Sequence, residues 1–230
     1  MIHILIVLTF GGSSCSNDQV PHKYKQAVIR LKSDLEQLDT IALEKREVTS
    51  NKDSNVYSGI IDFKKQAEYI TKNRRLWDEN FVMFNDALKS NKLGRWKDDA
   101  LFCKALALLK MATLENSDVY TESAISSMTD FIEYNQNSKI EKWTKRELKT
   151  VFWDKTALLF SNSLTEKDNL NTFFHLGIAS LLEHKKGDKR RAWEEYEEVL
   201  KIAPNSFFGQ QARGQIDLLK GKGRGLDLKF

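Results

Sequence analysis

The residue types that most often carry out chemistry are few and widely spaced in this sequence. Its four histidines are His3, His22, His175 and His184, and no pair of them has the HExxH spacing of a zinc site. The sequence also has no CxxC pair and no serine within GxSxG. The glycine-rich GKGRG at 221–225 lies in the tail and does not link a strand to a helix, as a phosphate-binding loop would. We therefore predict that the protein is not an enzyme and uses no metal ion or cofactor.

One acidic cluster could in principle bind a metal ion or transfer protons. Glu194, Glu195, Glu197 and Glu198 stand near the start of a predicted helix, on the side away from Trp193, Tyr196 and Leu200. Negative charge is favourable at the positive end of a helix, so we interpret the cluster as a solvated face. We interpret His175 as a packing or surface residue. The five tryptophans are predicted to pack between helices, with one or two as binding anchors.

Composition indicates a folded, all-α chain. Of its 230 residues 41% are hydrophobic, which is enough for a sizeable core, and 2 prolines leave long stretches free to be helical. The formal net charge of +4 is small for a nucleic-acid-binding protein, so no nucleic-acid partner is expected. The basic run at 185–191 is interpreted as a turn between helices, with a phosphate or acidic-partner contact as the alternative.

The N-terminal sequence resembles a bacterial lipoprotein signal. An apolar run, Ile4 to Phe10, precedes small residues and Cys15, so residues 1–14 are predicted to be a signal peptide and Cys15 the lipidated residue. Two features depart from that pattern, because Gly12 replaces the usual leucine and no Lys or Arg precedes the apolar run. A secretory signal or a cytosolic N-terminus is the alternative. Cys103, left without a partner, is predicted to be a small core residue.

Apolar residues at helical spacing define the elements that follow. One stripe, from Tyr24 to Ala42, predicts a helix, and residues 15–55 are assigned as tether, N-terminal helix and polar linker. A second stripe, from Ile60 to Leu88, is interrupted by Arg74 and predicts two antiparallel helices, or one unbroken helix from Gly59 to Gly94. The remaining predicted helices cover 97–112, 120–134, 140–159, 169–184, 189–203 and 207–220, and a flexible tail is predicted at 221–230.

The C-terminal half carries a spaced motif. Phe173, Leu176 and Gly177 are followed by Ala192, Tyr196 and Pro204, which resembles the tetratricopeptide pattern W-x2-L-G-x2-Y, A-x3-F, P. Small residues suit the closest helix contacts, an aromatic residue fills the space between helices, and a proline ends a helix. Ser180 replaces the tyrosine of the pattern. The spacing from Gly177 to Ala192 is three residues longer than that of the family.

An earlier hairpin repeats part of this motif. Ala124 and Met128 precede Ala192 and Tyr196 by 68 residues, twice the period of about 34 residues, and Asn137-Ser138 precedes Asn205-Ser206 by the same offset. Gln136 replaces the proline. The predicted helical-repeat domain covers 56–220, and its clearest repeat covers 170–215.

Together, the motif and the N-terminal sequence resemble the tetratricopeptide lipoproteins of the bacterial envelope, which include the outer-membrane barrel-assembly lipoprotein. The resemblance implies antiparallel helix pairs stacked as a right-handed solenoid. It also implies a non-catalytic scaffold or adaptor for protein partners, and its narrower form implies a role in outer-membrane protein assembly. Lipid on Cys15 would hold the protein on the outer membrane, facing the periplasm, as Ser16 after the cysteine implies. The alternatives are a soluble interaction protein and an accessory subunit of an enzyme complex.

Overall fold

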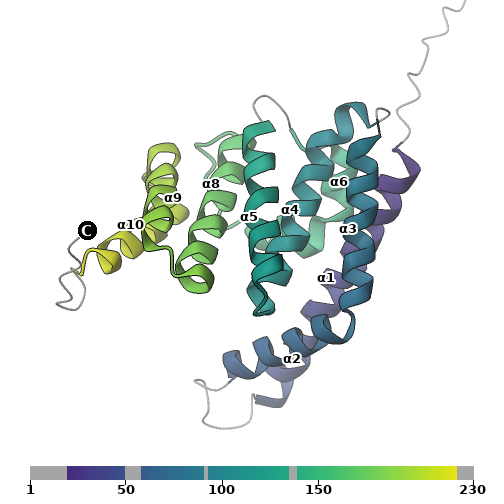
Figure 1. Cartoon of the computed structure of the whole chain (residues 1–230), viewed down its shortest axis with the longest axis horizontal. Helices are drawn as coiled ribbons and strands as arrows, with labels where there is room; N and C mark the ends of the chain where they lie inside the picture. Colours follow the sequence, from purple (N-terminus) through teal and green to yellow (C-terminus); the bar gives the residue numbers. More distant parts are fainter. Residues whose placement is uncertain (1–19, 50–57, 91–92, 135–138, 222–230) are drawn as a thin grey trace, which may run out of the picture.

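The computed structural model describes residues 20–49, 58–90, 93–134 and 139–221. Every regular element within these ranges is a helix, which confirms the all-α prediction (Figure 1). The predicted signal peptide, Cys15, the Asn137-Ser138 pair and residues 222–230 of the tail lie outside the described residues, as does most of the predicted linker.

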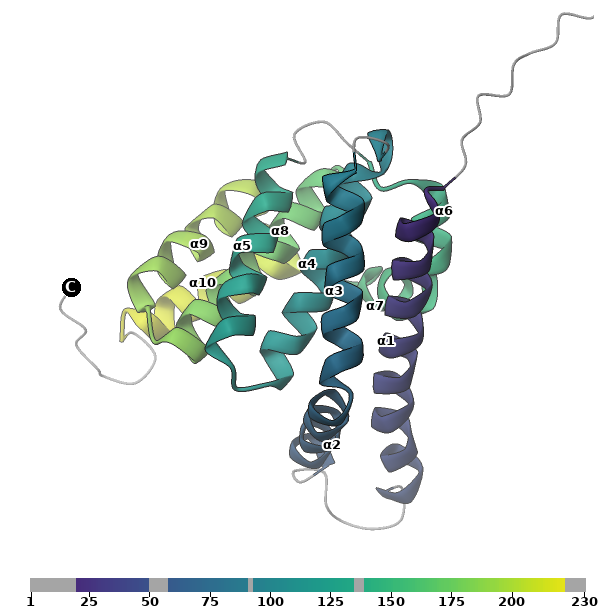
Figure 2. The ribbon, with the colours of Figure 1, turned by 45° about the vertical axis from the view of Figure 1, so that its right-hand side comes forward.

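The first three helices form the N-terminal part of the fold. Helix α1 (His22–Thr49) buries its predicted stripe as far as Leu38, and Tyr24, Val28 and Leu31 are fully buried. The second stripe is divided as predicted, because α2 (Ser58–Lys72) ends and α3 (Arg74–Lys89) begins on either side of Asn73. Both helices pack on α1 (Figure 2).

The predicted antiparallel arrangement of these two helices is wrong. The chain bends at Asn73, and Figure 1 shows α2 turning away from the axis of α3. The Asn73 N–H still bonds to the Tyr69 carbonyl at 3.0 Å, and its own carbonyl accepts from Leu76 at 2.8 Å. Helical bonding therefore continues almost across the break. A helical hairpin needs a loop of about 2–5 residues, so a single residue can bend the chain but cannot reverse it.

Helix α4 (Lys97–Leu114) is the centre of the fold. It follows a short 3₁₀ turn, η1 (Gly94–Trp96), and packs against α1, α2, α3, α5 (Asp118–Tyr134) and α8 (Glu166–Leu181). Consecutive residues from Asp98 to Cys103 are buried, so the helix is covered on nearly all sides. A helix that is apolar all round is expected in such a position.

The predicted continuous helix at 140–159 is wrong. The segment instead forms α6 (Lys142–Glu147), a wide turn of π type, η2 (Lys149–Trp153), and the short α7 (Asp154–Thr156). Leu158, expected on the apolar side, is 94% exposed. The wide turn lets two adjacent side chains, Phe152 and Trp153, both contact Phe102. Their ring centroids lie 5.0 and 5.9 Å, respectively, from the centroid of the Phe102 ring. Neighbours in a regular helix point about 100° apart, which would separate these rings.

The last three helices follow the predicted positions. Helix α8 is extended by a second π-type turn, η3 (Leu182–Lys186), and is followed by α9 (Lys189–Ile202) and α10 (Phe207–Leu219). Gly187, with φ of 68°, ends the wide turn, and Asp188 caps α9 through the Arg191 N–H. The three extra residues between Gly177 and Ala192 are thus accommodated in η3 and this turn. Figure 1 shows α4, α5, α8, α9 and α10 side by side in chain order.

Candidate partner-binding groove

Four of the predicted repeat residues are buried. Ala124, Met128 and Ala192 are fully buried, and Tyr196 is 1% exposed. A Cβ added to Gly177 would lie 3.2 Å from the Met128 sulfur and 3.3 Å from a methyl of Leu109. Gly177 of α8 therefore permits close approach to both α4 and α5. The structure brings together residues of the two sequence segments that share the motif.

Tyr196 is fixed at both ends of its side chain. Its ring is buried, and its hydroxyl donates to a Glu183 carboxylate oxygen at 2.8 Å, from α9 to η3. Burial, followed by this hydrogen bond, raises the pKa of the Tyr196 phenol. Pro204 is exposed in the turn after α9, while Phe173 and Leu176 are half-buried on α8. The side chains of Phe173 and Leu176 therefore remain available to contact a ligand.

The turn that follows Pro204 contains a close approach that the sequence motif does not reveal. Ser206 caps α10, and its hydroxyl oxygen accepts from the Gly209 N–H at 3.0 Å. A Cβ on Gly209 would lie 2.1 Å from the Ala203 carbonyl oxygen. Glycine is required here by the approach of the preceding backbone. No spacing rule within the motif identifies this position.

Phe173 and Gly177 line two adjoining cavities. The first, which we name the Lys110 cavity, has a volume of about 220 Å³ and is bounded by residues of α1, α2, α4, η2, α7 and α8. The second, the Tyr196 cavity, has a volume of about 290 Å³ and is bounded by α4, α8, η3, α9 and α10. Both are lined by Leu109, Phe173, Gly177 and Ser180. We refer to the two together as the groove.

The walls of the groove combine apolar and polar side chains. Leu109, Phe173, Leu176 and Phe208 give the Tyr196 cavity an apolar surface. Four polar side chains also line it, and all can donate or accept hydrogen bonds: Ser180, His184, Gln211 and Gln215. Apolar anchoring combined with a few polar groups is typical of binding pockets.

The charges of the groove lie at the Lys110 cavity. Lys155 of α7 forms an ion pair with Asp39 of α1 across it. Lys110, on α4, has no ion pair with any residue that the structure describes. Although Lys110 is exposed at the mouth of the cavity, desolvation by the surrounding protein lowers its pKa, the Lys155 charge lowers it further, and Asp39 raises it. Among the described residues that line it, the cavity therefore carries one cation in excess.

Three of the four glutamates in the acidic cluster of α9 have a basic partner. Glu195 contacts the His175 ring at 2.7 Å, which joins α9 to α8, and Glu194 pairs with Arg190 at 3.3 Å. Glu198 pairs with Lys201. Within the described part of the chain, no group of three His, Cys, Asp or Glu side chains could hold a metal ion. Glu194 and Glu197 are exposed, and Glu195 and Glu198 are half-buried.

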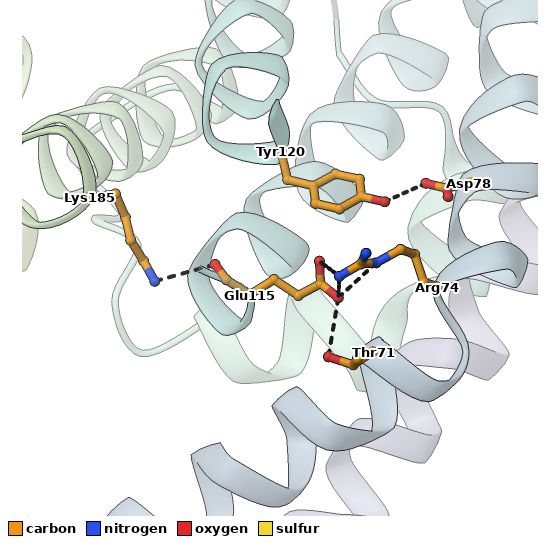
Figure 3. A network of polar contacts seen from close by, with 6 residues as sticks. All are labelled: Thr71, Arg74, Asp78, Glu115, Tyr120 and Lys185. Atoms are coloured by element: carbon orange, nitrogen blue, oxygen red, sulfur yellow. Dashed lines mark hydrogen bonds and ion pairs between the residues drawn. The ribbon is translucent and has the colours of Figure 1, made fainter. Parts of the chain in front are cut away.

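A second group of polar residues is a structural contact rather than an open site. Arg74, the polar residue that interrupts the second apolar stripe, donates to the Glu115 carboxylate at 3.1 and 3.2 Å (Figure 3). Thr71 also donates to this carboxylate, and the Glu115 carbonyl oxygen accepts from Lys185 at 3.4 Å. Tyr120 donates to Asp78 at 2.7 Å. The contacts join α2 and α3 to the α4–α5 turn.

A third group is fully enclosed. The Asp99 carboxylate accepts from the Glu141 N–H at 3.1 Å and from the Thr144 hydroxyl at 2.5 Å. Tyr24 is 2.7 Å from the same hydroxyl and therefore donates to it, and its oxygen lies 3.8 Å from the sulfur of Cys103. Burial raises the pKa of Asp99 to about 7, although both hydrogen bonds lower it. Cys103 is buried, as predicted.

Comparisons with known proteins do not identify a family. No family model, curated protein or solved structure matches the chain. None of the helices described is both long and apolar enough to cross a membrane. The groove is thus the feature from which a function can be inferred.

Proposed function

We propose that this protein is a non-catalytic scaffold that binds a segment of a partner protein in the groove. The observation that carries the proposal is the pair of adjoining cavities, whose shared wall contains the half-buried Phe173 and the glycine at 177. Aromatic side chains that are only partly covered are suitable anchors for a partner. The walls also offer hydrogen-bonding side chains, among them Gln211 and Gln215.

A tetratricopeptide-like arrangement supports this proposal. In our interpretation, α4 with α5 and α8 with α9 are antiparallel pairs of a right-handed solenoid, and α10 closes the stack. Helices α4, α8 and α10, which would be the first helices of successive pairs, all contribute to the Tyr196 cavity. Stacked helical repeats commonly present one such concave surface to a partner.

The cellular location in the proposal comes from the N-terminal sequence. Acylation of Cys15 would attach the scaffold to the outer membrane, facing the periplasm, where it would act on protein partners in the cell envelope. Attachment to one surface raises the effective concentration of partners held at the same surface. A role in outer-membrane protein assembly is the narrower form of the proposal, because it rests on the combination of lipoprotein signal and repeat motif.

Site-specific photo-crosslinking tests the proposal. A photoreactive amino acid would replace Ser180 or Gln211 in the groove, with Glu133 on the exposed side of α5 as the control position. Crosslinking would be performed in cells that produce the chain, followed by fractionation and mass spectrometry. We expect one protein to be crosslinked at both groove positions and not at Glu133. Equal products at all three positions, or none in the groove, would contradict the proposal.

A further inference from the structure

The excess cation of the groove has a defined setting. Lys110 and Lys155 both line the Lys110 cavity, while Asp39 pairs with Lys155 and supplies a single negative charge. Most of the remaining wall is apolar, and includes Leu35, Leu106 and Val151. A cation beside apolar walls interacts with an anion more strongly than it would in water. The site therefore favours a group that combines a carboxylate with an apolar stem.

The size of the cavity limits what can enter it. A volume of about 220 Å³ corresponds to roughly seven water molecules, at about 30 Å³ each. That is enough for one side chain and its nearest backbone, whereas a helix with its side chains is about 10 Å across and would not fit. The Lys110 cavity shares Phe173 and Gly177 with the Tyr196 cavity, so a longer chain that enters one cavity can contact the wall of the other.

We infer that the Lys110 cavity receives an aspartate or glutamate side chain from within the partner segment, with its carboxylate against Lys110. The apolar neighbours of this residue lie over Phe173 and Leu176. The polar side chains of the Tyr196 cavity, Gln211 and Gln215, bond to the extended backbone. This inference rests on the proposed function, and it adds the chemistry by which the groove selects a segment.

Peptide display on the purified full chain tests the inference. Random heptapeptides would be displayed between fixed flanking residues, so that neither end of the peptide is free. We expect enrichment of one acidic position with apolar neighbours. Synthetic peptides of the enriched sequence should lose about tenfold or more in affinity when the acid is changed to its amide, because the amide cannot form a charge-assisted contact with Lys110.

Two variants of α4 provide the matched comparison. Lys110→Met should reduce the affinity for the acidic peptide to the same degree as the amide change does. The amide peptide should bind the parent protein and Lys110→Met with equal affinity. Lys104→Met is the control, because Lys104 lies on α4 but lines a different surface, between α3 and α5. Thermal unfolding of each variant would confirm that both remain folded.

The possible outcomes distinguish failure of this inference from failure of the proposed scaffold function. If peptides are enriched without an acidic preference, or bind Lys110→Met as well as the parent protein, the groove binds peptides but the inference is wrong. If no peptide is enriched, and crosslinking in the groove also fails, the proposed function is itself overturned. Binding that depends on a free terminal carboxylate in place of an acidic side chain would also overturn the inference.

Discussion

Glu115, directly after the end of α4, is held by Arg74 at the start of α3, and the two differ sharply in exposure. The carboxylate side chain is 3% exposed and the guanidinium side chain 51% exposed, with a closest contact of 3.1 Å. The pair joins the bend at Asn73 to the α4–α5 turn. It thus links the N-terminal helices to the helices that form the groove (Figure 3).

This asymmetry predicts unequal effects of removing each partner. Arg74→Met leaves a buried carboxylate without its cation, whereas Glu115→Gln leaves an exposed cation that water can solvate. We expect Glu115→Gln to lower the free energy of unfolding by about 1–2 kcal/mol and Arg74→Met to lower it more. The double variant should be no less stable than Arg74→Met. Urea unfolding of all four proteins checks this, and equal, additive losses would contradict it.

Two glycines of α10 should respond in opposite directions to the same substitution. Gly209→Ala places a methyl group against the Ala203 backbone and should reduce the free energy of unfolding by about 1–3 kcal/mol. Gly214→Ala meets no atom within 4 Å and should raise it by about 0.5–1 kcal/mol, because alanine loses less entropy in a helix. Thermal and chemical unfolding measure both. A neutral Gly209→Ala would show that the turn can relax.

Titration of Asp99 should lower the free energy of unfolding as pH rises. Its pKa is raised from 3.8 to about 7, so between these values the folded state binds a proton that the unfolded state has released. The stabilisation is complete below about pH 4 and is lost as pH rises through about 7, at a cost on the order of 4 kcal/mol. Asp99→Asn should remove most of this slope in unfolding measured from pH 4 to 8.

Asp34 provides a comparison for this experiment. Burial raises its pKa to about 6, against the opposing effect of the Arg30 charge, so Asp34→Asn should remove a smaller part of the slope, at lower pH. A pH dependence that Asp99→Asn leaves unchanged would show that Asp99 titrates near its ordinary value in the folded protein.

Cys15 determines whether the protein is attached to the membrane in our proposal. Cys15→Ser removes the lipid-accepting sulfur and should move the protein from the membrane fraction to the soluble fraction. Mass spectrometry of the N-terminus of the parent protein should detect an acylated Cys15. Persistent membrane association of the variant, or an intact Met1 in the parent protein, would contradict the proposed lipid anchor.

Hydrophobic spacing was sufficient to predict the regular helices. The stripe of α1 and the break near Arg74 were both visible, because burial of one face requires a period near 3.6 residues. The same rule failed at 140–159. There, the adjacent residues Phe152 and Trp153 both pack on Phe102 of α4. Hydrophobic spacing along one segment gives no information about contacts with a ring on another helix.

The candidate site was only partly visible from the motif. Phe173, Leu176, Gly177 and Tyr196 were identified from spacing as packing residues, and all four also line the groove. Lys110 and Lys155 were not identified, because they lie 45 positions apart and converge only through the fold. Likewise, the pairing of Arg74 with Glu115 spans 41 positions and has no local pattern.

The position of Cys103 offers a way to observe the fold loosening. Its thiol is fully buried, with the Tyr24 hydroxyl of α1 beside it, and burial raises its pKa, so a maleimide added to the folded protein has no access to this sulfur. Modification requires a transient separation of the surrounding helices. The labelling rate of this one native residue, followed with and without a bound peptide, would therefore report how often the core opens and whether an occupied groove slows it.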